Sequence, residues 1–207
     1  MDSSKVQLSE QEMDLVSGPG FILMKNGIIT KVYECYGILA ENMKAITSEG
    51  KNRLPEDALV LTPRISRGEN YQGLPYVMLD YPRLFSTEHV FAIRTFFWWG
   101  KSFNITLHLK GRYQGMFSES LEKNLAMLKN SGFYISHTKD EWDHDILGAG
   151  YISLQQVTEE EFRAKLLSDG FIKIGTTFPI HQWNQATAIL TAAFKQLIDC
   201  LNQFPRR

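Results

Sequence analysis

Two histidines and four carboxylates fall within nine residues of the sequence, between His137 and Asp145. Divalent hard ions prefer carboxylate oxygens and transition metals accept imidazole nitrogens, so this segment carries ligands for either kind of ion. The candidate metal ligands are His137, Asp140, Asp143 and His144. A metal held there indicates a metal-assisted hydrolase or a related enzyme.

A second interpretation of the same segment needs no metal. The spacing of the acidic residues matches no known metal-binding loop and lacks the glycine that a calcium loop needs at its sharp turn. The segment is then a solvated acidic loop, with Trp142 as its anchor in the core. We favour this loop and keep the metal enzyme as the alternative.

Three charged or polar residues interrupt segments that are otherwise typical of buried strands. Arg94 lies inside an apolar run, and a buried guanidinium needs a partner because an unpaired one costs several kcal/mol. Asp80, on the preceding predicted strand, is the partner that we expect. His108 follows on the next strand, and a two-residue turn at Gly100 and Lys101 would place it opposite Ile93.

Two further arginines, Arg64 and Arg67, fall in a long polar connection over residues 47–72. Guanidinium groups bind carboxylates and phosphates with paired hydrogen bonds, and long loops are often functional. We therefore predict a site for a small anionic ligand at one end of the sheet. Its candidate residues are Arg64, Arg67, Asp80, Arg94 and His108.

The elements that hold these residues are predicted from hydrophobic periodicity and turn residues. Residues 76–81, 90–99 and 103–109 are rich in β-formers and predict three antiparallel strands, a meander within residues 75–110. Both alternating faces of residues 90–99 are apolar, so helices, a second sheet or a partner subunit must cover both faces. Shorter strands are expected at 58–61, 133–136, 151–154 and 171–174.

Helices are expected on either side of these strands. Apolar residues recur at spacings of three and four from Phe21 to Ile46, which predicts a long helix over 19–48 in a helical N-terminal segment, 1–50. Asn26-Gly27 is also a hairpin signal, so a break there stays open. Capping boxes at Ser9 and Thr158 predict two helix starts. Further helices are expected over 118–130 and, at the C-terminus, over 180–203.

Composition limits the classes of protein to consider. The 207 residues carry a net charge of -1, which gives no field to attract nucleic acid or anionic membranes. The apolar runs are far shorter than the ~20 residues that span a bilayer, and the N-terminus lacks a signal-peptide pattern. We expect one soluble, cytoplasmic α+β domain over 1–207, with an antiparallel sheet packed against amphipathic helices and with two reduced cysteines.

The sequence contains no phosphate-binding glycine loop, dinucleotide fingerprint, nucleophile elbow or paired Cys-x-x-Cys. We therefore predict a non-catalytic domain that binds a small anionic ligand or a protein partner and uses no cofactor. We expect it to be a homodimer that contacts neither nucleic acid nor membrane. The metal-assisted hydrolase remains the alternative function.

Overall fold

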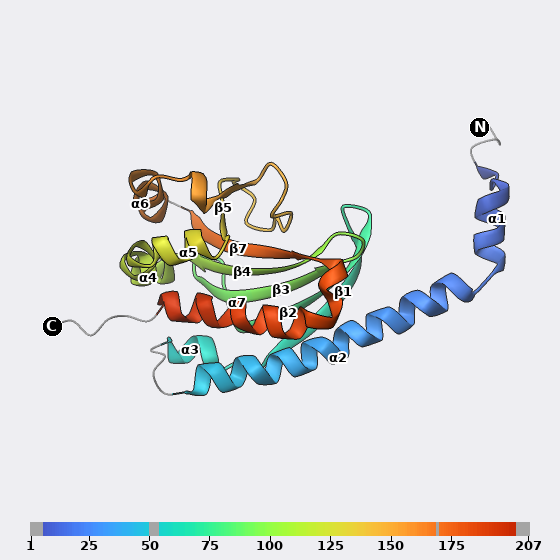
Figure 1. Ribbon diagram of the computed structural model, residues 1–207, viewed down its shortest axis with the longest axis horizontal. Coiled ribbons are helices and arrows are strands. Elements are labelled where there is room, and N and C mark those ends of the chain that lie inside the picture. The colour runs from blue at the N-terminus through green and yellow to red at the C-terminus, as the bar shows by residue number, and fades with distance from the viewer. Residues whose placement is uncertain (1–5, 50–53, 169, 202–207) are drawn as a thin grey trace.

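The computed structural model describes residues 6–49, 54–168 and 170–201. Within them, seven strands form one antiparallel sheet in the order β1-β2-β3-β4-β7-β5-β6 (Figure 1). The predicted α+β class and its central meander, here β1 to β4, are confirmed. The strands are β1 (Arg64–Tyr71), β2 (Leu74–Phe85), β3 (Val90–Trp98), β4 (Ser102–Lys110), β5 (Tyr134–Ser136), β6 (Tyr151–Ser153) and β7 (Phe171–Pro179).

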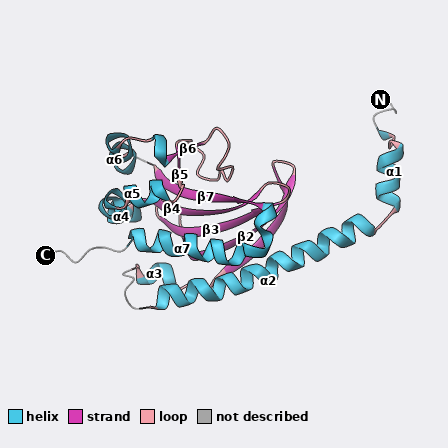
Figure 2. Ribbon diagram, in the orientation of Figure 1, coloured by secondary structure: helices cyan, strands magenta, loops and turns pink. Residues whose placement is uncertain are grey.

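Helices pack on one face of this sheet, where α2 and α7 lie side by side (Figure 2). None of the described helices combines the length and apolar character needed to cross a membrane. The α-helices are α1 (Glu10–Ser17), α2 (Gly20–Ser48), α3 (Glu56–Leu59), α4 (Arg112–Lys123), α5 (Leu125–Asn130), α6 (Glu159–Leu167) and α7 (Ala186–Leu201). The described residues also include the 3-10 helices η2 (Leu154–Gln156) and η3 (Ile180–Gln185).

The two faces of β3 have different environments because side chains alternate along a strand. Phe91, Ile93 and Phe97 belong to the hydrophobic core under the helices. Arg94 and Phe96 face the opposite side, which is covered by the loop of residues 137–150 between β5 and β6. The expectation that this strand is covered on both faces is confirmed, with helices on one side and a loop on the other.

The long N-terminal helix is continuous, which answers the question left open at Asn26-Gly27. α2 runs unbroken from Gly20 to Ser48, and its buried side chains begin only at Ile29. Both capping boxes are formed, by Ser9 at α1 and by Thr158 at α6. The predicted segment 1–50 includes residues 1–5 and 50, which lie outside the described residues.

The polar connection over 47–72 was wrongly predicted to be a loop with a strand at 58–61. It contains β1, an edge strand that needs no apolar pattern because none of its eight residues is buried and four are exposed. Residues 56–59 form the helix α3 instead, since Pro55 precedes the first turn and Glu56 and Asp57 lie within it.

Three other boundaries also differ from the prediction. The helix expected over 118–130 is two helices, α4 and α5, and begins earlier, at Arg112. The C-terminal helix opens with η3, and its predicted residues 202 and 203 lie outside the described residues. His108 pairs with Ala92 rather than Ile93, because Trp98 and Ser102 form the last β3–β4 pair and three residues connect them.

Candidate functional site

A cluster of charged and polar side chains lies between the sheet and the 137–150 loop. Asp80, His108, His144 and Lys173 are each no more than 6% exposed. Charged and polar groups are rarely buried unless they are paired, so the partner of each side chain in this cluster must be identified. The cluster comprises Asp80 from β2, Arg94 from β3, His108 from β4, Lys173 from β7, and Glu141 and His144 from the loop.

Arg94 lies at the centre of the cluster. Its guanidinium donates hydrogen bonds of 2.7 and 3.0 Å to the two carboxylate oxygens of Asp80, the residue opposite it on β2. The predicted ion pair is thus confirmed. The same guanidinium lies 5.4 Å from the ring centre of Phe85 and 5.7 Å from that of Trp142, close enough for cation–π attraction.

His144 anchors the loop on the sheet. Its ring stacks on Phe96 with 4.7 Å between ring centres, and its backbone N–H donates to the Tyr71 hydroxyl at 2.8 Å. Its Nε2 lies 3.3 Å from the Arg94 guanidinium and its Nδ1 lies 3.3 Å from Lys173 Nζ. Burial, then Lys173 and Arg94, hold the pKa of His144 well below its usual value, so the ring stays neutral.

Lys173 connects β7 to the same loop. Its ammonium donates to the backbone carbonyls of Glu141, at 3.1 Å, and of Asp143. Burial and the neighbouring Arg94 lower the pKa of Lys173 to about 7. This lysine was missed among the sequence-predicted site residues, although it interrupts the apolar run Phe171 to Ile174 in the way that Arg94 interrupts its own strand.

His108 is the least satisfied member of the cluster. Its Nε2 lies 3.4 Å from a Glu141 carboxylate oxygen, but the geometry is not that of a hydrogen bond, and no other described residue supplies a partner. Burial, followed by the cations Lys173, Arg94 and Lys110, lowers the pKa of His108 to about 3. A buried, neutral imidazole therefore faces a small inner cavity with an unused nitrogen.

That inner cavity, of about 10 Å³, has room for roughly one water molecule. Beside it lies a larger hollow of about 400 Å³, which we name the outer pocket. Phe85, Glu141 and Trp142 line both spaces and separate them. Lys110 Nζ donates to the two carboxylate oxygens of Glu141 at 3.2 and 3.3 Å. The outer pocket is lined by Phe85, Ser86, Thr87, Val90, Lys110, Glu141 and Trp142.

No family model, curated protein or solved structure matches this chain.

The candidate metal ligands are not brought together. Within the described ranges, no group of three histidine, cysteine or acidic side chains is arranged to hold a metal ion. His137 is exposed, whereas both ring nitrogens of His144 face cationic groups, which disfavours a metal ion there. Asp143 instead accepts a hydrogen bond from Tyr71. Asp140 accepts one from the Trp142 backbone.

The favoured interpretation of the segment, a solvated loop anchored by Trp142, is correct in part. Residues 137–150 do form a loop, but its anchor is not Trp142, which is 48% exposed. His144 and Ile146 are the buried residues of the loop. A β7 glycine makes room for this docking, since a Cβ at Gly175 would lie 3.1 Å from the Ile146 side chain and closer still to β4.

The two β1 arginines of the predicted anion site do not converge. Arg64 and Arg67 are both exposed on β1, opposite Asp80 and Val77 respectively. Residues three apart on a strand point to opposite faces of the sheet, so these two guanidinium groups belong to different surfaces. Arg64, paired with Asp80 across β1 and β2, lies on the same face of the sheet as Asp80, Arg94 and His108, whereas Arg67 lies on the opposite face.

Proposed function

We propose that this protein is a non-catalytic domain that binds a small organic anion in the outer pocket. The ligand carries a carboxylate or phosphate group and an apolar body. Its charged group pairs with Lys110 above the buried cations Arg94 and Lys173. Its apolar body packs against the contacting rings of Phe85 and Trp142, whose centres lie 6.1 Å apart.

The electrostatic environment of the buried histidines supports this proposal. Burial is the largest cause of the lowered pKa of His108, and three cationic groups nearby, Lys173, Arg94 and Lys110, lower it further. Asp80 already pairs with Arg94, and Lys173, with its pKa lowered to about 7, is charged in only part of the molecules at neutral pH, so Lys110 is the cation that faces the outer pocket. A cation in a partly desolvated pocket favours an anion over a neutral ligand of the same shape.

The position of Glu141 is the observation that carries the proposal. Its carboxylate lies between Lys110 Nζ, at 3.2 Å, and His108 Nε2, at 3.4 Å, at the boundary of the two spaces. This carboxylate occupies the place that the anionic group of the ligand takes on binding. Its side chain is 23% exposed, so it can swing outward without unfolding the loop.

The size and lining of the outer pocket set the class of ligand. A space of about 400 Å³ falls in the range of small-molecule sites. Its aromatic walls suit a flat apolar group, and the hydroxyl-bearing residues Ser86 and Thr87 offer polar contacts at its rim. Benzoate and inorganic phosphate are suitable probes, because they separate the contribution of the apolar body from that of the charge.

Isothermal titration calorimetry of the full chain with each probe tests the proposal. We expect benzoate to bind more tightly than phosphate, and Lys110→Met to weaken benzoate binding about tenfold or more, as expected for the loss of about 1.4 kcal/mol. Arg67→Met is the matched control, since it removes an exposed cation from the edge strand and should leave binding unchanged. Equal affinities of the wild type and Lys110→Met would place the site elsewhere and reject the proposal.

A further inference from the structure

The N-terminal arm, defined here as residues 6–24, projects beyond the sheet (Figure 1). None of the eight residues of α1 is buried. Of the seventeen large apolar side chains exposed among the described residues, nine belong to this arm. Because monomeric proteins rarely expose large contiguous apolar surfaces, the arm indicates an interaction surface. The nine residues are Val6, Leu8, Met13, Leu15, Val16, Phe21, Ile22, Leu23 and Met24.

The packing stripe of α2 continues into this arm. Val32 and Tyr36 are fully buried against the body of the protein. Phe21 and Met24 extend the same helical stripe toward the N-terminus, yet they are 55% and 68% exposed. One apolar face thus runs the length of α2, and only its C-terminal part is covered within the chain.

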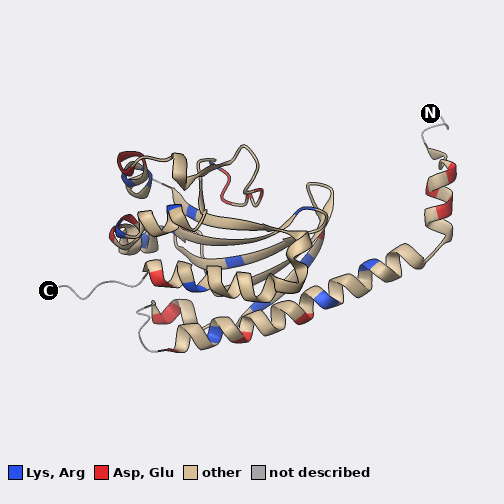
Figure 3. Cartoon of the chain, in the orientation of Figure 1, with Lys and Arg blue, Asp and Glu red and all other residues tan. Residues whose placement is uncertain are grey.

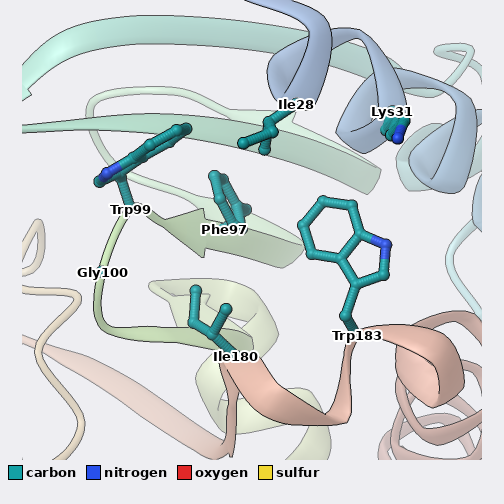
Figure 4. Close-up of a pocket in the computed structure, with 7 residues that line it drawn as sticks. All are labelled: Ile28, Lys31, Phe97, Trp99, Gly100, Ile180 and Trp183. Atoms are coloured by element: carbon teal, nitrogen blue, oxygen red, sulfur yellow. The ribbon is translucent and has the colours of Figure 1, made fainter. Parts of the chain in front are cut away.

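An unfilled apolar pocket lies at the foot of the arm (Figure 4). It has a volume of about 350 Å³ and is bounded by α2, by the β3–β4 turn and by η3. Aromatic and aliphatic side chains form its walls, and the exposed Lys31 lies at its rim. This apolar pocket is lined by Ile28, Lys31, Phe97, Trp99, Gly100, Ile180 and Trp183.

We infer that the arm of one copy docks in the apolar pocket of a second copy, which forms a two-fold dimer. The continuous helix α2 carries the arm away from the pocket of its own chain, whereas a symmetric partner fills both pockets at once (Figure 1). The arm has 19 residues and the pocket seven, which matches the ~20–30 residues that each partner gives to a standard interface.

Charge complementarity favours a second copy as the occupant. α1 carries Glu10, Glu12 and Asp14 and no basic residue (Figure 3). Lys31, at the rim of the apolar pocket, forms no ion pair with any residue that the structure describes. Docking brings the acidic helix of one copy to this lysine of the other. An anionic membrane is a poor occupant, because helices that lie on such membranes are rich in Lys and Arg.

The test is the mass of the full chain by light scattering during size-exclusion chromatography, over a range of concentrations. The wild type is expected to be a dimer, and Phe21→Asp with Met24→Asp is expected to be a monomer. Ile38→Asp is the matched control, since Ile38 lies on the same helix and is 59% exposed but belongs to neither the arm nor the pocket. This control is expected to remain a dimer with a wild-type circular dichroism spectrum.

A charge reversal tests the docking partner within the dimer. Lys31→Glu is expected to raise the dimer dissociation constant about tenfold or more, and adding Glu10→Lys and Asp14→Lys is expected to restore it. Glu12 is left unchanged because it forms the capping box of α1. A monomeric wild type would overturn the inference. A dimer that tolerates Lys31→Glu, or the Phe21 and Met24 changes, would also overturn it.

Discussion

Arg94 and Asp80 lie directly opposite each other on β3 and β2, and both carboxylate oxygens of Asp80 accept hydrogen bonds from the Arg94 guanidinium. The two side chains are 13% and 8% exposed, so this is a largely buried ion pair. The pair fixes the guanidinium beside the rings of Phe85 and Trp142 and next to His144. These two rings also line the outer pocket, so the ion pair supports its aromatic wall from within.

Removing either member of this ion pair is expected to lower the stability of the fold. Asp80→Asn or Arg94→Met alone should lower the free energy of unfolding by about 3–5 kcal/mol, because each leaves a buried charge without its partner. The double variant should cost less than the sum of the two single changes. Urea unfolding of all four proteins measures the coupling. Additive losses would show that the two groups do not stabilise each other.

Local patterns predicted the Asp80–Arg94 pair and much of the fold. A charged residue inside an apolar run needs a partner of opposite charge. The neighbouring predicted strand contained one acidic residue, Asp80, so the expected pairing of the two strands was enough to predict its contact with Arg94. The register of His108 was wrong by one residue because the length of the β3–β4 connection was not determined by Gly100 and Lys101 alone. A turn of three residues in place of two moves each pairing by one position.

Acid should destabilise the fold through the buried histidines. The pKa of His108 is lowered from 6.5 to about 3, and that of His144 is lowered in the same direction, so the unfolded chain binds protons that the folded chain excludes. The free energy of unfolding should therefore fall as the pH decreases from 6.5 toward 3, by up to about 1.4 kcal/mol per pH unit for each histidine. Urea unfolding at several pH values measures this slope.

His108→Gln is the control for the pH effect, since it removes one of the titrating groups. Its unfolding free energy should depend less steeply on pH than that of the wild type, whatever its stability at pH 7. An unchanged slope would mean that His108 takes up its proton equally in the folded and unfolded states.

Loss of Lys173 should release the loop while the sheet stays folded. Lys173→Met removes the ammonium that donates to the carbonyls of Glu141 and Asp143, so the loop should open more often. Hydrogen exchange of the His144 and Asp145 amides should become about tenfold faster or more, as expected when about 1.4 kcal/mol of local stability is lost. Exchange of the Leu107 amide in β4 serves as the internal control. Equal acceleration at Leu107 would indicate global unfolding instead.

Neutralising Glu141 should strengthen anion binding. Glu141→Gln keeps the size of the side chain but removes the negative charge that pairs with Lys110, so that lysine becomes available to the ligand. The calorimetric affinity for benzoate should rise by about threefold to tenfold, in line with an ion pair worth about 1 kcal/mol. Weaker binding by Glu141→Gln would show that the carboxylate contacts the ligand favourably rather than competing with it.

The outer pocket was beyond the reach of sequence patterns. Lys110 and Phe85 lie at strand ends, 25 residues apart, and meet Trp142 only because the 137–150 loop folds back over the sheet. Periodicity within a short segment does not predict which distant loop will cover a sheet. The separation of Arg64 and Arg67 was also missed, because β1 lacks the apolar alternation by which strands are recognised. In a strand, residues three positions apart lie on opposite faces.

The most direct test of the anion site is a nuclear magnetic resonance titration of the full chain with benzoate, observing the indole N–H signals of its four tryptophans. The Trp142→Phe variant assigns the Trp142 signal. The account predicts a saturable shift of that signal in the wild type and a much weaker response in Lys110→Met. A titration in which Trp142 does not respond, or in which Trp99 and Trp183 of the apolar pocket respond instead, would contradict it.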